Sequence, residues 1–346
     1  MDLCKINNSI VRVERFDEDG KYFNINADIF ARIISNCDNS PITVTKINEL
    51  STVQKEYNTN RSERFVIRVF YYKNNVEHTK DFFIKKSKEQ KPHEVLNYLY
   101  LQNNDAPIPK LYAYYSEDNE NDIMIMEVVE PLHQVGEDFM LNEKFFKPFI
   151  IATAEFNSVK ISDEYKAFLS ERWDIVNKKI IPYKTKLEQA FTITHEQEKY
   201  DKLKKYFSRK TLDVLLSLHE KMCQKIITME KGIYHWDHSP YNSGWSALQN
   251  KHVIFDLEMT LWAPRFINIG AWIGGNDKKY APNEELALLY LSIYNQRLGA
   301  NISTDIFLYE CYPLWIESRF QHLLWYFNDN DEKLLSCIDL LASSNL

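Results

Sequence analysis

The sequence predicts an α+β protein, with an antiparallel sheet in its first part and mostly helices in the remainder. Between Pro41 and Pro131, short apolar runs alternate with turn residues, as expected for strands. From 163 to 231, Gly and Pro are scarce and apolar residues recur every three or four positions, as in helices. A chain of 346 residues can form two lobes, each with a core of its own.

Composition argues against several classes of protein. A hydrophobic content of 45% and a charged content of 26% are typical of soluble globular proteins. The net charge of −7 gives no basic surface for nucleic acid. The 5 cysteines have no Cys-x-x-Cys spacing, so we expect reduced thiols rather than a zinc site. The sequence shows no signal-peptide pattern and no bilayer-length apolar run, so we expect a cytoplasmic protein with no membrane partner.

The elements follow in order along the chain. Residues 1–40 are interpreted as an N-terminal extension, with a helix capped near Asn26. A second helix is expected to begin near Pro92, because apolar residues then recur at helical spacing. Strands are expected at 42–45, 64–72, 79–85, 108–113 and 123–127. After residue 131, helices are expected at 145–156, 163–231, 284–298 and 305–327.

Two short motifs carry the candidate chemistry. The first, His-x-Asp-x-x-x-x-Asn, runs from His235 to Asn242 and includes Asp237. The second is an apolar strand, 253–255, that ends on Asp256. A hairpin would bring two carboxylates and an amide together, and Mg²⁺ prefers such oxygen ligands. An aspartate beside them could accept a proton from a hydroxyl nucleophile.

These motifs resemble those of the aminoglycoside phosphotransferase and choline kinase-like family, usually His-Gly-Asp-x-x-x-x-Asn followed by Ile-Asp-x-Glu. The resemblance implies a two-lobed protein-kinase-like fold, with an antiparallel-sheet N-lobe at 41–130 and a mostly helical C-lobe at 131–346 that carries the catalytic loop and the acceptor pocket. It implies transfer of the γ-phosphate of ATP, or of another nucleoside triphosphate, to a hydroxyl of a small molecule. Asp237 would be the catalytic base, and Asn242 and Asp256 would hold Mg²⁺.

The resemblance also implies the nucleotide contacts. In the family a lysine at the end of an N-lobe strand reaches the phosphates, and strand alternation lets only one of Lys85 and Lys86 point that way. Lys85 fits the family's Val-Leu-Lys ending better. Glu94 would pair with this lysine, although the first turn of a helix favours a carboxylate in any case. The backbone from Glu127 to Val129 would meet the edge of the adenine.

Several residues depart from the family pattern or allow two interpretations. The loop 51–62, where the phosphate-covering loop belongs, has no glycine, although backbone amides must approach the phosphates there. Asn268 stands where the family has an aspartate that braces the catalytic loop, and it lacks the charge. His235 is expected to brace that loop too. Trp236 replaces the motif's glycine, and it either lines the acceptor pocket or packs. Glu258 is either a second metal ligand or a solvated carboxylate.

Two other functions are compatible with the sequence. One is a catalytically weak or inactive kinase-like module that binds a nucleotide or another ligand. The loop 51–62 and Asn268 favour it, whereas the intact set of Asp237, Asn242 and Asp256 opposes it. The other is a protein kinase, which is disfavoured because no Ala-Pro-Glu activation segment follows Asp256. The identity of the acceptor is open, but the aromatic and acidic residues of the C-lobe would suit a cationic amine.

Overall fold

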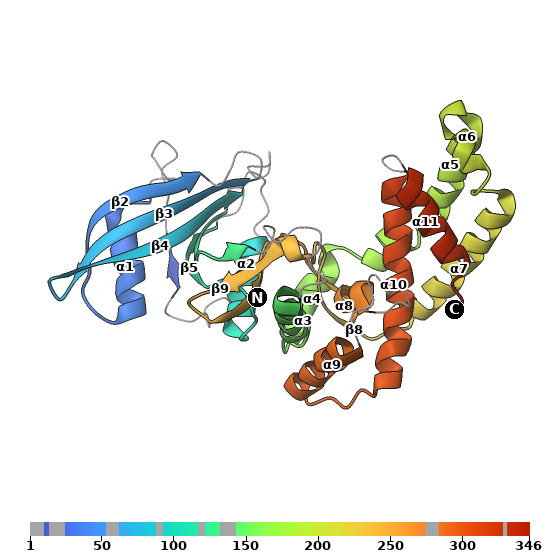
Figure 1. Ribbon diagram of the computed structural model, residues 1–346. Helices are drawn as coiled ribbons and strands as arrows, with labels where there is room; N and C mark the ends of the chain where they lie inside the picture. The colour runs from blue at the N-terminus through green and yellow to red at the C-terminus, as the bar shows by residue number, and fades with distance from the viewer. Residues whose placement is uncertain are drawn as a thin grey trace. The chain divides into compact units, whose positions relative to one another are not determined.

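The protein is described from a computed structural model (Figure 1), which covers residues 10–13, 25–52, 62–87, 93–116, 122–131, 143–273, 284–327 and 331–346. The chain separates into two compact units. The first comprises Met1–Ala152 and Asp237–Met259, and the second comprises Thr153–Trp236 and Thr260–Leu346. The segment that follows Trp236, with both motif aspartates, therefore folds with the N-terminal sheet. The domain boundaries expected at residues 40 and 130 stay a prediction.

A six-stranded sheet in the order β1-β5-β6-β4-β3-β2 forms the centre of the first unit. Its strands are β1 (Val11–Arg12), β2 (Thr43–Thr52), β3 (Ser62–Lys73), β4 (Val76–Ser87), β5 (Leu111–Tyr115) and β6 (Ile123–Met126). The pairs among β2 to β6 are antiparallel, as predicted, and β1 adds a parallel pair with β5, so the sheet is mixed. Asn74 and Asn75, with φ of 52° and 63°, form the tight turn between β3 and β4.

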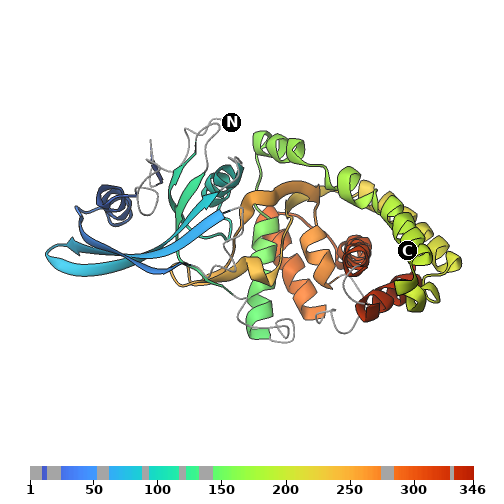
Figure 2. The same ribbon diagram turned by 90° about the horizontal axis from the view of Figure 1, so that it is seen from above.

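Helix α1 (Ala27–Asp38) lies against one face of this sheet (Figures 1 and 2). Its N-cap is Asn26, as predicted, and the side chain accepts a hydrogen bond from the backbone of Ile29. Phe30 of α1 packs on Phe82 of β4 with 5.1 Å between ring centroids, within the hydrophobic core on that face. Because successive side chains of a strand alternate, this core determines which residues of β4 face the other way.

The part of the two motifs that follows Trp236 lies on a hairpin of the first unit. Strands β10 (Lys251–Ile254), β9 (Ser243–Ser246) and β7 (Glu130–Pro131) form a three-stranded sheet in that order. The 3₁₀ turn η7 (Pro240–Asn242) precedes β9. After β10, the chain turns through Asp256 into the 3₁₀ turn η8 (Leu257–Met259). The strand therefore ends before Asp256, and strand alternation does not put Glu258 on the same face as Asp256.

The second unit is mostly helical, as predicted, and is completed by an antiparallel pair of strands, β8 (Lys231–His235) and β11 (Thr260–Pro264). Its helical segments include α4 (Asp163–Arg172), η5 (Val176–Ile180), α5 (Tyr183–Glu196), η6 (Glu198–Tyr200), α6 (Asp201–Lys204), α7 (Arg209–Ile227), α8 (Ile267–Ile273), α9 (Glu284–Leu298), α10 (Thr304–Tyr326) and α11 (Asp331–Ala342). Helix α2 (His93–Asn103) lies in the first unit, and α3 (Glu143–Asn157) begins in the first unit and ends in the second. None of the described helices combines the length and apolarity needed to span a bilayer.

Candidate active site

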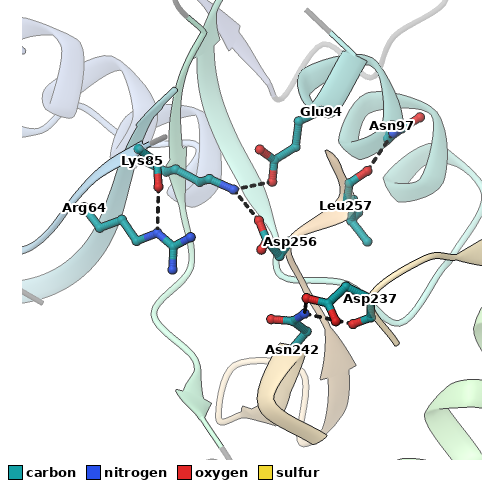
Figure 3. Close-up of polar contacts among 9 residues, drawn as sticks. Arg64, Lys85, Glu94, Asn97, Asp237, Asn242, Asp256 and Leu257 are labelled. Carbon is teal, nitrogen blue, oxygen red and sulfur yellow. Dashed lines mark hydrogen bonds and ion pairs between the residues drawn. The ribbon is translucent and has the colours of Figure 1, made fainter. Parts of the chain in front are cut away.

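Lys85 forms a buried ion pair with Glu94 in the first unit (Figure 3). Its Nζ atom lies 2.8 Å from Glu94 Oε1, and the two residues are only 5% and 4% exposed. Phe82 and Ile84 of the same strand belong to the hydrophobic core under α1, so Lys85 faces the opposite side of the sheet. Glu94 lies there because it is in the first turn of α2. The structure thus brings Lys85, rather than Lys86, to the predicted glutamate.

Asp256 also reaches Lys85, across 171 positions of sequence. Its Oδ1 atom is 2.5 Å from Lys85 Nζ, and its side chain is 32% exposed, so the carboxylate is partly open to solvent. The backbone of Asp256 has φ of 62°, a left-handed conformation that is uncommon for residues other than glycine and that concentrates at functional sites. Asn97 of α2 donates a 2.7 Å hydrogen bond to the carbonyl of Leu257 and so holds the following turn (Figure 3).

The charges of this triad depend on one another. Burial alone would lower the pKa of Lys85, but the carboxylates of Glu94 and Asp256 outweigh burial and raise it well above its usual value. Burial raises the pKa of Glu94 to about 7, the Lys85 ammonium opposes this rise, and the Asp256 carboxylate adds to it. The ammonium is therefore permanent, whereas Glu94 takes up a proton near neutral pH.

Asp237 and Asn242 form a second pair in the same unit. The side-chain nitrogen of Asn242 donates to the carboxylate and to the backbone carbonyl of Asp237, each at 2.8 Å. Asp237 is exposed. The carbonyl of Asn242 accepts a 2.9 Å hydrogen bond from the backbone of Phe255, the residue before Asp256. This hydrogen bond brings the two motifs together, as the hairpin prediction requires.

The side chains of Asn242 and Asp256 carry oxygen atoms of the kind that Mg²⁺ prefers. Because the amide nitrogen of Asn242 is used on Asp237, its Oδ1 atom is the one that can ligate a cation. Asp256 supplies a carboxylate from the neighbouring backbone. Mg²⁺ usually takes one or two carboxylates from a protein and completes its shell with water and phosphate oxygens. Among the described residues, no group of three or more His, Cys, Asp or Glu side chains is arranged to hold a metal.

Both the backbone N–H and the carboxylate of Glu127, a predicted hinge residue, form hydrogen bonds within the first unit. Its backbone N–H donates to the carbonyl of Lys110 at 2.9 Å, so this N–H already has an acceptor. Its buried carboxylate accepts hydrogen bonds from the backbone of Lys110 at 3.0 Å, from Gln249 at 2.9 Å and from Ser246. The carboxylate therefore fastens the end of β6 to the β9–β10 hairpin. Val129, further along the same segment, is half-buried.

Gly244 is a site residue that the sequence reasoning did not single out. A Cβ atom on it would lie 2.3 Å from the carbonyl oxygen of Glu130 and 2.7 Å from Cγ1 of Val129. The absence of a side chain therefore lets β9 pair with β7, directly beside the predicted hinge. The signal available in the sequence was an isolated glycine inside a strand between the two motifs.

Asn268 braces the start of the catalytic motif in the second unit. Its Oδ1 atom accepts hydrogen bonds from the backbone N–H of His235 at 3.1 Å and from Asn157 at 3.0 Å. Its Nδ2 atom donates to the carbonyl of His235 at 2.8 Å. The amide therefore brackets His235, which is fully buried, and supplies a donor that an aspartate would lack.

In the loop 51–62, residues 53–61 lie outside the described residues.

The comparisons with known proteins identify the fold. No protein-family model and no curated protein matches the chain. The structure is similar to a choline kinase from Cryptosporidium parvum Iowa II, with a TM-score of 0.51 and 15% identity over 87% of each chain. It is also similar to an aminoglycoside phosphotransferase from Alicyclobacillus acidocaldarius subsp. acidocaldarius DSM 446, with a TM-score of 0.50 and 14% identity over 79% of this chain and 86% of that one. The predicted protein-kinase-like α+β fold, and the resemblance at the level of the fold, are confirmed.

Proposed function

We propose that the protein is a small-molecule kinase, which transfers the γ-phosphate of ATP to a hydroxyl group. The observation that carries the proposal is the convergence of Lys85, Glu94 and Asp256. A buried, permanently charged ammonium held by two carboxylates is costly to build, and it suits the binding of phosphate oxygens. The similar solved structures are a choline kinase and an aminoglycoside phosphotransferase, which supports the same class of reaction.

In this proposal the first unit binds both the phosphates and the adenine of the nucleotide. Lys85 donates to phosphate oxygens while Glu94 holds the ammonium in place. The carbonyl of Glu127 and the N–H of Val129 meet the edge of the adenine, because the N–H of Glu127 is already used on Lys110. Asn242 and Asp256 hold Mg²⁺, which supplies neutralising charge to the β- and γ-phosphates when it is bound.

Asp237 acts on the acceptor. Asn242 fixes one oxygen of the Asp237 carboxylate, which leaves the other oxygen to accept the hydrogen bond of the acceptor hydroxyl. As the new O–P bond forms, the bond from the γ-phosphorus to the bridging oxygen of ADP breaks, and the hydroxyl proton passes to Asp237. The exposed position of Asp237 is compatible with this role, since the acceptor must reach it from solvent.

The test separates binding from turnover. Thermal unfolding would be followed with ATP and Mg²⁺, and ADP formation would be measured with a panel of hydroxyl compounds. We expect nucleotide to raise the melting temperature of the wild type and of Asp237→Ala, and turnover to fall about 10³-fold or more in Asp237→Ala alone. Asp213→Ala is the matched control, because Asp213 is an exposed aspartate of α7 that pairs with Arg209.

Two results would contradict the proposal. If no nucleotide stabilises the protein, the first unit is not a nucleotide site. If nucleotide binds but no compound of the panel is phosphorylated, the alternative of an inactive nucleotide-binding module is favoured. Lys85→Met adds a further check where ATP stabilises the wild type, because the loss of the ammonium should abolish that stabilisation whether or not the protein phosphorylates an acceptor.

A further inference from the structure

A second cation lies beside Lys85 on the face of the sheet that carries the proposed phosphate site. Arg64 of β3 is the direct cross-strand partner of Lys85 of β4. Opposite residues of an antiparallel pair point to the same face, and their Cα atoms lie about 4.5–5.5 Å apart. Figure 3 shows both side chains leaving the sheet on the same side. Both residues, like Glu94 and Asp256, belong to the first unit.

Packing on the other face of β3 fixes the direction of Arg64. Ile67 and Val69 belong to the hydrophobic core under α1, and Phe65 packs against it. Alternation along the strand therefore turns Arg64 away from this core. Its Nε atom donates a 3.1 Å hydrogen bond to the hydroxyl of Ser62, which is 3% exposed. Within the described residues, the guanidinium of this half-buried arginine forms no other hydrogen bond or ion pair, so both Nη atoms are available to a ligand.

An arginine on the same face of β3 shows how such a charge is neutralised within the sheet. Arg68 lies directly opposite Asp81 and forms two hydrogen bonds with its carboxylate, at 2.7 and 2.8 Å. Arg64 instead lies opposite a lysine, and like charges in this position destabilise a sheet. Burial lowers the pKa of Lys85, its two carboxylate partners raise it above its usual value, and Arg64 opposes them. Among the described residues, Arg64 therefore lacks the anionic partner that Arg68 has.

A nucleotide needs more positive charge than Lys85 alone supplies. Lys85 is paired with Glu94 and Asp256, and one ammonium with two carboxylates sums to one negative charge. Such a charge repels the phosphates of a nucleotide. The loop 51–62 has no glycine, which hinders close approach of its backbone amides to a phosphate. The guanidinium of Arg64, just beyond this loop, brings the charge of the group to zero.

We propose that Arg64 is a second phosphate-binding residue of the nucleotide site, whose two Nη atoms donate to phosphate oxygens beside the Lys85 ammonium. This inference rests on the proposed function and extends it to a residue outside the kinase-like motifs. A planar guanidinium donates two parallel hydrogen bonds to one phosphate, which an ammonium cannot do. The hydrogen bond from Nε to Ser62 orients the guanidinium and leaves its Nη edge open.

The experiment measures binding by calorimetry and thermal unfolding, so it does not require turnover. ATP with Mg²⁺, inorganic triphosphate with Mg²⁺, and adenosine would each be titrated into the wild type and into Arg64→Met. We expect the affinity for ATP and for triphosphate to fall about 10- to 100-fold in Arg64→Met, because charge-assisted hydrogen bonds are lost. The affinity for adenosine, which has no phosphate, should stay unchanged.

Further variants separate the charge of Arg64 from its place in the sheet. Arg64→Lys keeps the charge and should lose less affinity for ATP than Arg64→Met. Arg68→Met is the matched control, because it removes a guanidinium from the same face of the same strand, and it should leave the affinity for ATP unchanged. If Arg64→Met does not fold, Arg64→Gln takes its place, since it removes the charge and keeps a polar side chain.

The outcomes separate this inference from the proposed function. An affinity of Arg64→Met for ATP equal to that of the wild type overturns the inference, even if the wild type phosphorylates an acceptor. An equal loss of affinity for adenosine overturns it too, because Arg64 would then act through the fold. If only the affinities for ATP and triphosphate fall, the inference stands even where no acceptor is phosphorylated, and the kinase proposal alone fails. A wild type that binds neither ATP nor triphosphate overturns both.

Discussion

The side chain of Asn242 donates to the carboxylate and to the backbone carbonyl of Asp237, each at 2.8 Å. In the proposed function, this pair orients the base, Asp237, and leaves the amide oxygen of Asn242 as the atom that would ligate Mg²⁺. Asn242 therefore has two proposed tasks, to orient Asp237 and to ligate Mg²⁺. Its amide nitrogen is needed for the first of them.

Asn242→Asp should separate these tasks. The new carboxylate can still ligate Mg²⁺, but it cannot donate to Asp237 and it repels that carboxylate. We expect kcat to fall about 10²-fold while the stabilisation by ATP and Mg²⁺ is kept. Steady-state kinetics and thermal unfolding measure the two effects. Asn250→Asp, an exposed position of the same hairpin, makes the same change of charge and should leave both unchanged.

A second prediction concerns pH and follows from Glu94. Its pKa in the folded protein is raised to about 7, so its negative charge is lost as the pH falls through 7. We expect the affinity for ATP to decline over that range, because a protonated Glu94 no longer holds Lys85. ATP titrations at pH 6 and pH 8 measure this difference. In Glu94→Gln the difference should shrink to the part that the titration of the ATP γ-phosphate causes, and an unchanged pH dependence in that variant would contradict the assignment.

The raised pKa of Glu94 also makes stability depend on pH, in the direction opposite to that of the ATP affinity. The folded state holds its proton on Glu94 more tightly than the unfolded chain, whose carboxyl has a pKa near 4.5. The contribution of this group is therefore fully present below about pH 4.5 and is lost as the pH rises through 7. Comparing denaturant unfolding of the wild type with that of Glu94→Gln at pH 6 and pH 8 isolates this contribution. As the pH rises, the ATP affinity should thus increase while the contribution of Glu94 to stability decreases.

Local patterns in the sequence predicted much of the fold and part of the site. Strand alternation depends only on neighbouring positions, so it predicted that just one of Lys85 and Lys86 points to the phosphates. The choice of Lys85 came from the resemblance, and the core that contains Phe82 and Ile84 places Lys85 on the opposite face. The contact of Lys85 with Asp256 spans 171 positions and depends on a left-handed turn at an aspartate, which no periodicity indicates. The hydrogen bonds of the Glu127 carboxylate could not be predicted either, because its partners Ser246 and Gln249 lie on a hairpin far along the sequence.

A third prediction tests how much the hydrogen bonds of the Glu127 carboxylate contribute to stability. Glu127→Ala leaves Ser246, Gln249 and the backbone of Lys110 without their buried acceptor. We expect a loss of about 2–4 kcal/mol in the free energy of unfolding, measured with urea. Glu130→Ala is the control, because Glu130 is an exposed glutamate three residues further along. Equal effects of the two substitutions would show that the hydrogen bonds of Glu127 contribute nothing to stability.

The last prediction reverses the expectation that an aspartate would brace the catalytic motif better than Asn268. In Asn268→Asp, the carboxylate still accepts from the backbone of His235 and from Asn157, but its second oxygen faces the carbonyl of His235. Asn268 is 4% exposed, so this repulsion is poorly screened by water. We expect the substitution to destabilise the protein by about 1–3 kcal/mol in urea unfolding. Asn301→Asp, at an exposed position, should change stability little. A more stable Asn268→Asp would mean that a negative charge, rather than the donated hydrogen bond, is what the backbone of His235 requires.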